Sequence, residues 1–195
     1  MPGEITIYTD GAASGNPGPG GYGVVLISGR HRLEKAEGFR LTTNNRMELM
    51  AVITGLEALK IAGSNVVIYT DSKYVADSVE KGWVFKWEST AFKKKKNPDL
   101  WIRFLKVYRK HNVRFVWIKG HSNNIENEIC DRLAVNAHVK FIAESREDFF
   151  ICAVDQIASS AGSVVVAAVE EDWFLHWRIG GHQVHGRGHC RGGRN

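Results

Sequence analysis

The sequence predicts an α/β fold in which a five-stranded mixed sheet is flanked by helices. Three β-rich segments come first, and their short connections favour an antiparallel meander. A long segment with helical apolar spacing follows them. Two further apolar strands then alternate with helices, and helical crossovers of this kind join parallel strands. A chain of 195 residues, 44% of them hydrophobic, can bury the core that such a fold needs.

The first part of the chain supplies the antiparallel strands and the first helix. We expect strands at residues 4–9, 22–28 and 33–41. A segment rich in Gly and Pro at 11–21 is typical of a loop. Residues 45–62 carry apolar side chains at helical spacing, with Asn45 as a suitable N-cap and Gly63 as a suitable stop.

The next part supplies the parallel strands and their crossovers. We expect a strand at 66–70, a short helix after Asp71, a helix at 99–110, a strand at 113–119 and a last helix at 125–142. The strand at 66–70 is almost continuously apolar, which is typical of a strand buried on both faces. The predicted sheet therefore has three antiparallel strands and two added in parallel.

Charge divides the chain near residue 144. Residues 1–143 hold 21 Lys/Arg and 14 Asp/Glu, a net charge of +7, whereas residues 144–195 hold five Arg, no Lys and seven acids, a net charge of −2. The last twenty residues follow neither a helical nor a strand period. We expect one folded domain at 1–143 and a partly disordered C-terminal extension of unknown role at 144–195.

Composition narrows the cellular setting. The net charge of +5 hints at an acidic partner. Three cysteines, an odd number without metal-site spacing, favour a reducing compartment. The N-terminus lacks the pattern of a signal peptide. The apolar stretch at 149–169 is interrupted by Asp155 and Gln156, which makes it a poor membrane span. We therefore expect a cytoplasmic protein with no membrane segment.

Four acidic residues stand where this sheet could bring them together: Asp10, Glu48, Asp71 and Asp131. We expect Asp10 to end the first strand and Asp71 the fourth, at the sheet edge where open α/β sheets bind ligands. Glu48 and Asp131 can reach that edge if the two strands are neighbours. Each acid also has a plain structural alternative: a turn at Asp10, a capping box between Asn45 and Glu48, a helix N-cap at Asp71 and Ser72, and a solvated position at Asp131.

Together, four carboxylates at one edge would repel one another and raise one another's pKa values. Divalent cations resolve such repulsion, and ligands that are all oxygen suit Mg²⁺ or Mn²⁺ rather than Zn²⁺. Two ions about 4 Å apart could clamp the attacking water and the leaving oxygen of a phosphodiester. The pattern therefore indicates metal-assisted phosphodiester hydrolysis.

Four long segments occur in a characteristic order: YTDGAASGNPGPGGYG at 8–23, TTNNRMELMAVITGLEAL at 42–59, YTDSKYV at 69–75 and VWIKGHSNNIENEICDRLA at 116–134. With these segments the chain closely resembles the type 1 ribonuclease H family in its bacterial form. The match covers about residues 3–142. The resemblance implies a ribonuclease H-like fold with its catalytic domain at 1–143. It implies an endonuclease that cuts the RNA strand of RNA–DNA hybrids and leaves a 5′-phosphate and a 3′-hydroxyl.

The resemblance also implies roles for particular residues. Asp10, Glu48, Asp71 and Asp131 would bind two Mg²⁺ ions, with Mn²⁺ as a possible substitute. His121 would be the mobile histidine that aids proton transfer and product release, and its loop position alone would suit a surface residue equally well. The partner would be an RNA–DNA hybrid, and we expect the protein to act as a monomer.

Contacts with the hybrid follow from the same resemblance. Asn16, Thr43, Asn44 and Asn45 look like the polar residues that touch the hybrid in the family, although turn and cap chemistry would also account for them. Residues 81–119 hold twelve Lys/Arg and only two acids, interleaved with aromatic residues. In many relatives this region forms a basic handle, here about 81–99, that grips the DNA strand. Lys73, which is close to Asp71 in the sequence, is also expected to contact the hybrid. The expected contacts within the handle are Trp83, Lys86, Trp87, Lys93, Lys94, Lys95 and Lys96.

Departures from the family and competing interpretations are few. Lys73 stands where relatives often carry Gln, and Leu41 where they often carry Arg. Transposases and integrases of this fold carry acids in the order Asp, Asp, Glu, whereas this chain has Asp, Glu, Asp, Asp. A reverse-transcriptase domain would be joined to a polymerase. A non-catalytic hybrid-binding module would need no carboxylate cluster. The tail could bind metal, but its candidate ligands match no structural zinc pattern: His176, His182, His185, His189 and Cys190.

Overall fold

The computed structural model describes residues 4–120, 124–139, 164–169, 172–179 and 182–188. The chain divides into two compact units, Met1–Ala143 and Glu144–Asn195, and each is described by itself. Within the described ranges, no helix has the length and apolar character that a bilayer crossing requires.

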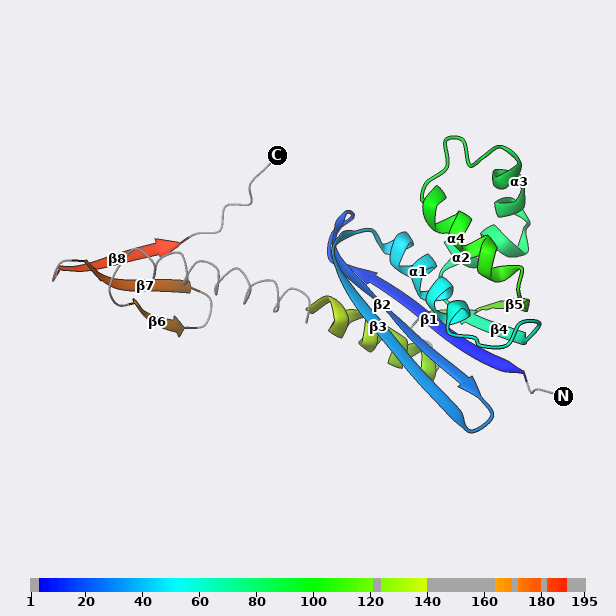
Figure 1. Cartoon of the computed structure of the whole chain (residues 1–195), viewed down its shortest axis with the longest axis horizontal. Coiled ribbons are helices and arrows are strands. Elements are labelled where there is room, and N and C mark those ends of the chain that lie inside the picture. Colours follow the sequence, from blue (N-terminus) through cyan, green and yellow to red (C-terminus); the bar gives the residue numbers. More distant parts are fainter. Residues whose placement is uncertain (1–3, 121–123, 140–163, 170–171, 180–181, 189–195) are drawn as a thin grey trace. The chain divides into compact units, whose positions relative to one another are not determined.

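The first unit contains the predicted five-stranded mixed sheet, in the order β3-β2-β1-β4-β5 (Figure 1). Its strands are β1 Ile5–Ala13, β2 Gly18–Ser28, β3 His31–Thr42, β4 Asn65–Thr70 and β5 Asn112–Trp117. β1, β2 and β3 form an antiparallel meander, while β4 and β5 extend it in parallel from β1. The predicted fold class is therefore confirmed, and β1 and β4 are neighbours, as the convergence of the acids requires.

The predicted loop at 11–21 is wrong for most of its length, because β1 continues to Ala13 and β2 begins at Gly18. Glycine serves close packing here rather than a turn. A Cβ on Gly23 would clash with the backbone carbonyl of Cys130, and one on Gly21 would lie 2.6 Å from the carbonyl oxygen of Ala134. The strand glycines therefore let the helix at 125–139 lay its backbone against the sheet.

Five helical segments accompany the sheet in the described part of this unit: α1 Asn44–Glu57, α2 Lys73–Glu80, α3 Trp83–Ser89, α4 Pro98–Tyr108 and the helix at 125–139. α1 packs on β1 and β2, and a Cβ on Gly55 would lie 3.4 Å from Val24 of β2. Gly23, which faces the helix at 125–139, is the chain neighbour of Val24. Since neighbouring strand residues point to opposite faces, these two helices cover opposite faces of the sheet.

The boundaries of α1 differ from the prediction. Thr43, not Asn45, is the N-cap residue, and it makes no side-chain capping bond. The helix ends at Glu57 rather than at residue 62. Leu59 continues the helical apolar spacing and still packs against the core, although it lies beyond the helix. The spacing therefore misled the prediction, because a side chain can reach the core from a turn as well as from a helix.

The basic segment, residues 81–97 between α2 and α4, contains a helix, α3, that the sequence pattern did not indicate. Gly82, with φ of 68°, adopts the left-handed conformation and separates α3 from α2. α4 packs against α1 with Trp101 and Phe104 fully buried. Phe92 of the basic segment and Trp101 of α4 therefore belong to the core.

The second unit contains three antiparallel strands in the order β6-β7-β8: Val164–Val169, Asp172–Ile179 and His182–Gly188. The sequence showed no strand period over the last twenty residues, so β8 and the end of β7 are a correction. Backbone pairing fixes these strands in the structure, and regular alternation of side chains is not required for it. The role of the extension stays open.

Replacing Gly23 with Ala should destabilise the first unit by about 1–3 kcal/mol, because the added methyl group overpacks the contact with Cys130. The measurement is chemical denaturation followed by circular dichroism. Gly29→Asn is the control, since Gly29 lies in open space at φ 58° and Asn tolerates that conformation. Equal stability of the Gly23→Ala and parent proteins would contradict the packing described above.

Candidate active site

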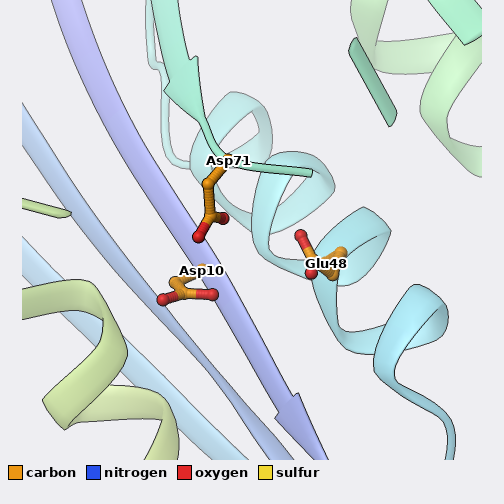
Figure 2. A group of neighbouring side chains, drawn as sticks. All are labelled: Asp10, Glu48 and Asp71. Carbon is orange, nitrogen blue, oxygen red and sulfur yellow. The ribbon is translucent and has the colours of Figure 1, made fainter. Parts of the chain in front are cut away.

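Three carboxylates from different elements of the first unit meet in one group. Asp10 comes from β1, Glu48 from α1, and Asp71 from the residue that follows β4. One oxygen from each lies within 4.8 Å of the others, and Figure 2 shows the three side chains turned toward one another. Asp10 and Glu48 are buried, being 9% and 8% exposed, while Asp71 is partly exposed. The structure therefore assembles three of the four predicted acids into one group.

Strand register places Asp10 beside Asp71. β1 and β4 run parallel, and their pairing ends with Thr9 opposite Thr70. Each aspartate is the next residue along its own strand direction, so the two carboxylates leave the sheet side by side. The expectation that Asp10 ends the first strand is wrong, because β1 runs on to Ala13 in its pairing with β2. Asp10 instead lies one residue beyond the point where β4 ends and its pairing with β1 stops. The end of β4 therefore leaves room beside β1 for the carboxylate group.

Gly11 brings Glu48 into the group. A Cβ on Gly11 would clash with the backbone nitrogen of Glu48 and would lie 2.8 Å from the Cβ of Met47. Only glycine allows the first turns of α1 to approach β1 this closely. The Gly11 N–H also donates a 2.7 Å hydrogen bond to Asp10 Oδ1. The sequence pattern predicts a loop at Gly11 and does not indicate this role, although the position of Gly11 directly after Asp10 is the available signal.

Asp71 is held from the β5 side. The indole Nε1 of Trp117 donates to the carbonyl oxygen of Asp71 at 2.9 Å. A Cβ on Gly120 would lie 2.7 Å from Asp71 Oδ2, so glycine lets the backbone after β5 pass against this carboxylate. Ser72 caps α2 through its side chain, which accepts from the Val75 N–H. Capping chemistry and site chemistry therefore occupy adjacent residues, and the predicted cap at this position falls on Ser72.

Burial and mutual repulsion raise the pKa values of two of these acids. Burial, followed by the charges of Asp71 and Asp131, raises the pKa of Asp10 to about 7, although the Gly11 N–H partly opposes the shift. Burial, followed by the charges of Asp10 and Asp71, raises the pKa of Glu48 to about 8. Without a counter-charge, the group therefore cannot be fully ionised near neutral pH.

The group fits a hard divalent cation. Asn44 Nδ2 donates to Glu48 Oε1 at 2.9 Å, whereas Glu48 Oε2 is buried and has no hydrogen-bond partner of good geometry among the described residues, although the nearby Ser72 side chain lowers the pKa of Glu48. A buried carboxylate oxygen without a donor costs free energy unless a cation satisfies it. All the ligand atoms are oxygens, which suits Mg²⁺, Mn²⁺ or Ca²⁺ better than Zn²⁺. Asp10, Glu48 and Asp71 could hold such an ion.

The remaining predicted catalytic residues differ in what the structure says of them. Asp131 lies half-buried in the helix at 125–139, outside the group of three but near enough for its charge to raise the pKa of Asp10. His121 lies outside the described residues. Of the tail residues with a possible metal role, His189 and Cys190 do too. In the described ranges, the three carboxylates are the one group with metal-ligating geometry.

The four polar residues expected to touch substrate lie on two segments. Asn16 is exposed in the connection between β1 and β2, directly before Pro17. Thr43, Asn44 and Asn45 lie at the start of α1, and the two asparagines are exposed. Because Asn44 already donates to Glu48, it joins this surface directly to the carboxylate group.

The predicted basic contacts lie mostly on the surface. Lys73, Lys86 and Lys93 to Lys96 are exposed, and Trp83 is 41% exposed. The ring centroids of Trp83 and Trp87 lie 6.5 Å apart, and Lys95 Nζ lies 5.2 Å from the centre of the Trp87 ring. Lys73 Nζ lies 4.7 Å from the ring of Trp117, beside Asp71. Cation–aromatic contacts thus order two lysines that solvent alone would leave mobile.

Comparison with known families gives a consistent match to the first unit. A family model described as RNase H matches residues 2–139. A ribonuclease H of Trichodesmium erythraeum is 58% identical over 142 residues, which are 70% of this chain and 90% of that protein. A ribonuclease HI of Synechocystis is 50% identical over 143 residues, which are 70% of this chain and 89% of that protein.

Solved structures match a similar share of this chain. A type 1 RNase H with the type 2 active-site motif has a TM-score of 0.65 at 32% identity, covering 72% of this chain and 74% of that chain. An RNase H1 from compost, solved in complex with an RNA/DNA hybrid, has a TM-score of 0.54 at 29% identity, covering 71% of this chain and 99% of that chain.

Replacing Asp10 with Asn should stabilise the metal-free protein at pH 8. Because the pKa values of Asp10 and Glu48 are raised in the folded state, the folded protein binds more protons than the unfolded one between about pH 4 and pH 8. The free energy of unfolding should therefore fall as pH rises through that window. The variant should melt higher by roughly 2–4 °C for each kcal/mol of repulsion removed.

Thermal melting in EDTA at pH 5 and at pH 8 measures this effect. The gain should be larger at pH 8, and adding Mg²⁺ should raise the melting temperature of the parent more than that of the variant. Asp77→Asn is the control, since Asp77 is a surface acid of α2 paired with Lys81. A variant less stable than the parent at pH 8 would contradict the crowding of charge described here.

Proposed function

Because this chain belongs to the RNase H family, in its bacterial type 1 branch, we propose that it hydrolyses the RNA strand of RNA–DNA hybrids with two divalent metal ions. The chain is a ribonuclease H. The observation that carries the mechanism is the group of Asp10, Glu48 and Asp71, which brings three acids within 4.8 Å. A relative solved in complex with an RNA/DNA hybrid supports the substrate class.

The metal ligands we propose are Asp10, Glu48, Asp71 and Asp131, with Mg²⁺ as the ion and Mn²⁺ as a possible substitute. When bound, the two ions supply Lewis-acid stabilisation of the reacting phosphate and lower the pKa of water. The orphaned Oε2 of Glu48 and the raised pKa of Asp10 support the assignment, since both are relieved by a cation. Asp131, which lies in the helix at 125–139, would complete the set.

In the reaction, the oxygen of a water molecule forms a bond to phosphorus, and the bond from phosphorus to the 3′-oxygen breaks. The proton lost by water is balanced by the proton gained at the 3′-oxygen, so the products are a 5′-phosphate and a 3′-hydroxyl. His121 would carry a proton in this exchange, since imidazole titrates near neutrality. The reaction needs no nucleophilic side chain, because water supplies the attacking oxygen.

Substrate recognition would use the polar residues near the carboxylates. Asn16, Thr43, Asn44 and Asn45 would donate to and accept from the hybrid along its minor groove, where the 2′-hydroxyl distinguishes RNA from DNA. Since Asn44 also donates to Glu48, the strand that it touches would be set directly over the carboxylates.

The basic segment would grip the backbone of the hybrid. Lys73, Lys86 and Lys93 to Lys96 would contact phosphates, and Trp83 and Trp87 would offer flat apolar surfaces to sugars. The exposure of the lysines and the contact of Lys95 with the Trp87 ring support this assignment.

We expect the protein to act as a monomer in the cytoplasm.

The direct test is cleavage of an end-labelled RNA–DNA hybrid of about two helical turns. We expect cuts in the RNA strand only, with Mg²⁺ present, and none with EDTA. Asp71→Asn should reduce kcat by at least about 10³-fold while hybrid binding persists, because the variant loses a ligand and keeps the surface. Digestion of the products with a phosphatase identifies the 5′-phosphate.

Duplex DNA, duplex RNA and single-stranded RNA serve as substrate controls. Binding of the hybrid without cleavage, in both Mg²⁺ and Mn²⁺, would sink the enzymatic proposal and favour a hybrid-binding module. The protein lacking residues 144–195 would be assayed beside the full chain, so that an effect of the extension is seen separately.

Replacing Lys93 to Lys96 with Ala should weaken hybrid binding and leave kcat within about twofold, because the lysines act on the backbone away from the carboxylates. The slope of log Kd against log salt should decrease by up to about one for each lysine that binds a phosphate in the parent protein. A salt dependence identical to that of the parent would show that these lysines do not contact the hybrid.

A further inference from the structure

The basic segment joins two helices that lie close to the carboxylates: α2 follows Asp71 in the chain, and α4 packs against α1, which carries Glu48. It starts after α2, which begins two residues beyond Asp71, and it ends at Asn97, where α4 begins. Between these ends, Ala91, Phe92, Lys94 and Asn97 adopt positive φ values although none of them is glycine. Backbone in that conformation persists where surrounding contacts hold it. The end of the segment therefore needs an anchor.

Arg46 supplies that anchor from the first turns of α1. Its guanidinium donates to both carboxylate oxygens of Asp99, at 3.0 and 2.7 Å, and to Asn97 Oδ1 at 3.3 Å. Asn97 Nδ2 in turn donates to the Tyr74 hydroxyl at 3.2 Å, and the indole of the buried Trp101 donates to the same oxygen at 2.8 Å. Arg46 of α1 and Tyr74 of α2 therefore both bond the side chain of Asn97, and Trp101 of α4 bonds the same Tyr74 hydroxyl.

Arg46 stands two residues before Glu48 on α1, so the anchor and one carboxylate share one rigid turn. Tyr74 stands three residues after Asp71, so the second contact shares the turn that follows another carboxylate. A planar guanidinium that binds a carboxylate through two parallel bonds fixes direction as well as distance. The carboxylates and the end of the basic segment are thereby tied to one geometry.

We propose that Arg46, through Asp99 and Asn97, is a positioning residue that holds the basic segment in register with the carboxylates. The inference rests on the proposed function, since the segment must grip the same hybrid that the carboxylates cut. Arg46 acts through the segment rather than on the substrate, so its removal would misplace the lysines and leave the reacting group intact.

Charge separates this role from a direct contact with the hybrid. Arg46→Ala removes a positive charge near the substrate, and Asp99→Ala removes a negative one. If only charge acted on the anionic hybrid, the first change would raise KM and the second would lower it. If the pair positions the segment, both changes break the same contact and both raise KM.

A second ion pair of the same kind provides the matched control. Arg103 of α4 donates to both carboxylate oxygens of Glu57, at 2.7 and 2.6 Å, and so joins α4 to the far end of α1. Arg103→Ala and Glu57→Ala therefore remove an equivalent bridge between the same two helices, away from the basic segment. Loss of helix packing alone would affect both pairs alike.

The experiment measures KM and kcat for hybrid cleavage by the full chain and by the Arg46→Ala, Asp99→Ala, Arg103→Ala and Glu57→Ala proteins. Arg46→Ala and Asp99→Ala should each raise KM by roughly tenfold, with kcat within about twofold. The two control variants should keep the KM of the parent. Asp99→Asn is a milder second variant, and melting temperatures establish that each protein is folded.

The same substitutions are then made in the protein with Lys93 to Lys96 replaced by Ala. There, Arg46→Ala should raise KM little further, because the groups that it positions are gone. Three results would overturn the inference. They are opposite shifts of KM for Arg46→Ala and Asp99→Ala, shifts of KM in the control pair as large as those in the Arg46–Asp99 pair, and fully additive effects in the protein in which Lys93 to Lys96 are replaced by Ala. A parent protein that cuts no hybrid would instead overturn the proposed function, and this inference with it.

Discussion

Repulsion among Asp10, Glu48 and Asp71 is the constraint on which the rest of the first unit depends. Three acids within 4.8 Å, two of them buried, cannot all be ionised at neutral pH without a counter-charge. A fold that holds them together must therefore supply the free energy from elsewhere, through a well-packed sheet and two helices that cover its opposite faces. Binding of cations then recovers what the crowding costs, and the same ions supply the chemistry proposed for the site.

The fold meets this constraint with backbone geometry more than with side chains. Parallel pairing of β1 and β4 sets Asp10 beside Asp71, and that register leaves no freedom to move them apart. Gly11 admits α1 and its Glu48, and Gly120 admits the chain that follows β5. Each glycine sits next to an acid or against one. The close approach of the α1 backbone to β1 is thus what brings the carboxylates together. A single methyl group at Gly11 would push Glu48 away from Asp10.

The sequence predicted the sheet and the meeting of three of the four candidate acids, because both depend on local patterns and on strand order. Short β-rich and apolar runs located β1, β4 and β5, and short connections indicated the meander. Prediction failed where a residue type has two uses. Residues 18–21 were predicted to be loop but lie within β2, since close helix packing needs glycine as much as a turn does. The bonds of Arg46 with Asp99 and Asn97 join residues about fifty positions apart, and no spacing along the chain could reveal them.

The most direct test of the central claim is the number of protons released when Mg²⁺ binds. Titration calorimetry at pH 7 in two buffers of different ionisation enthalpy gives that number. With pKa values of about 7 for Asp10 and about 8 for Glu48, Mg²⁺ should displace protons at pH 7, and the release should shrink at pH 9. Binding of Mg²⁺ without proton release at pH 7 would mean that the carboxylates are already ionised, and that their repulsion is not the constraint around which this structure is built.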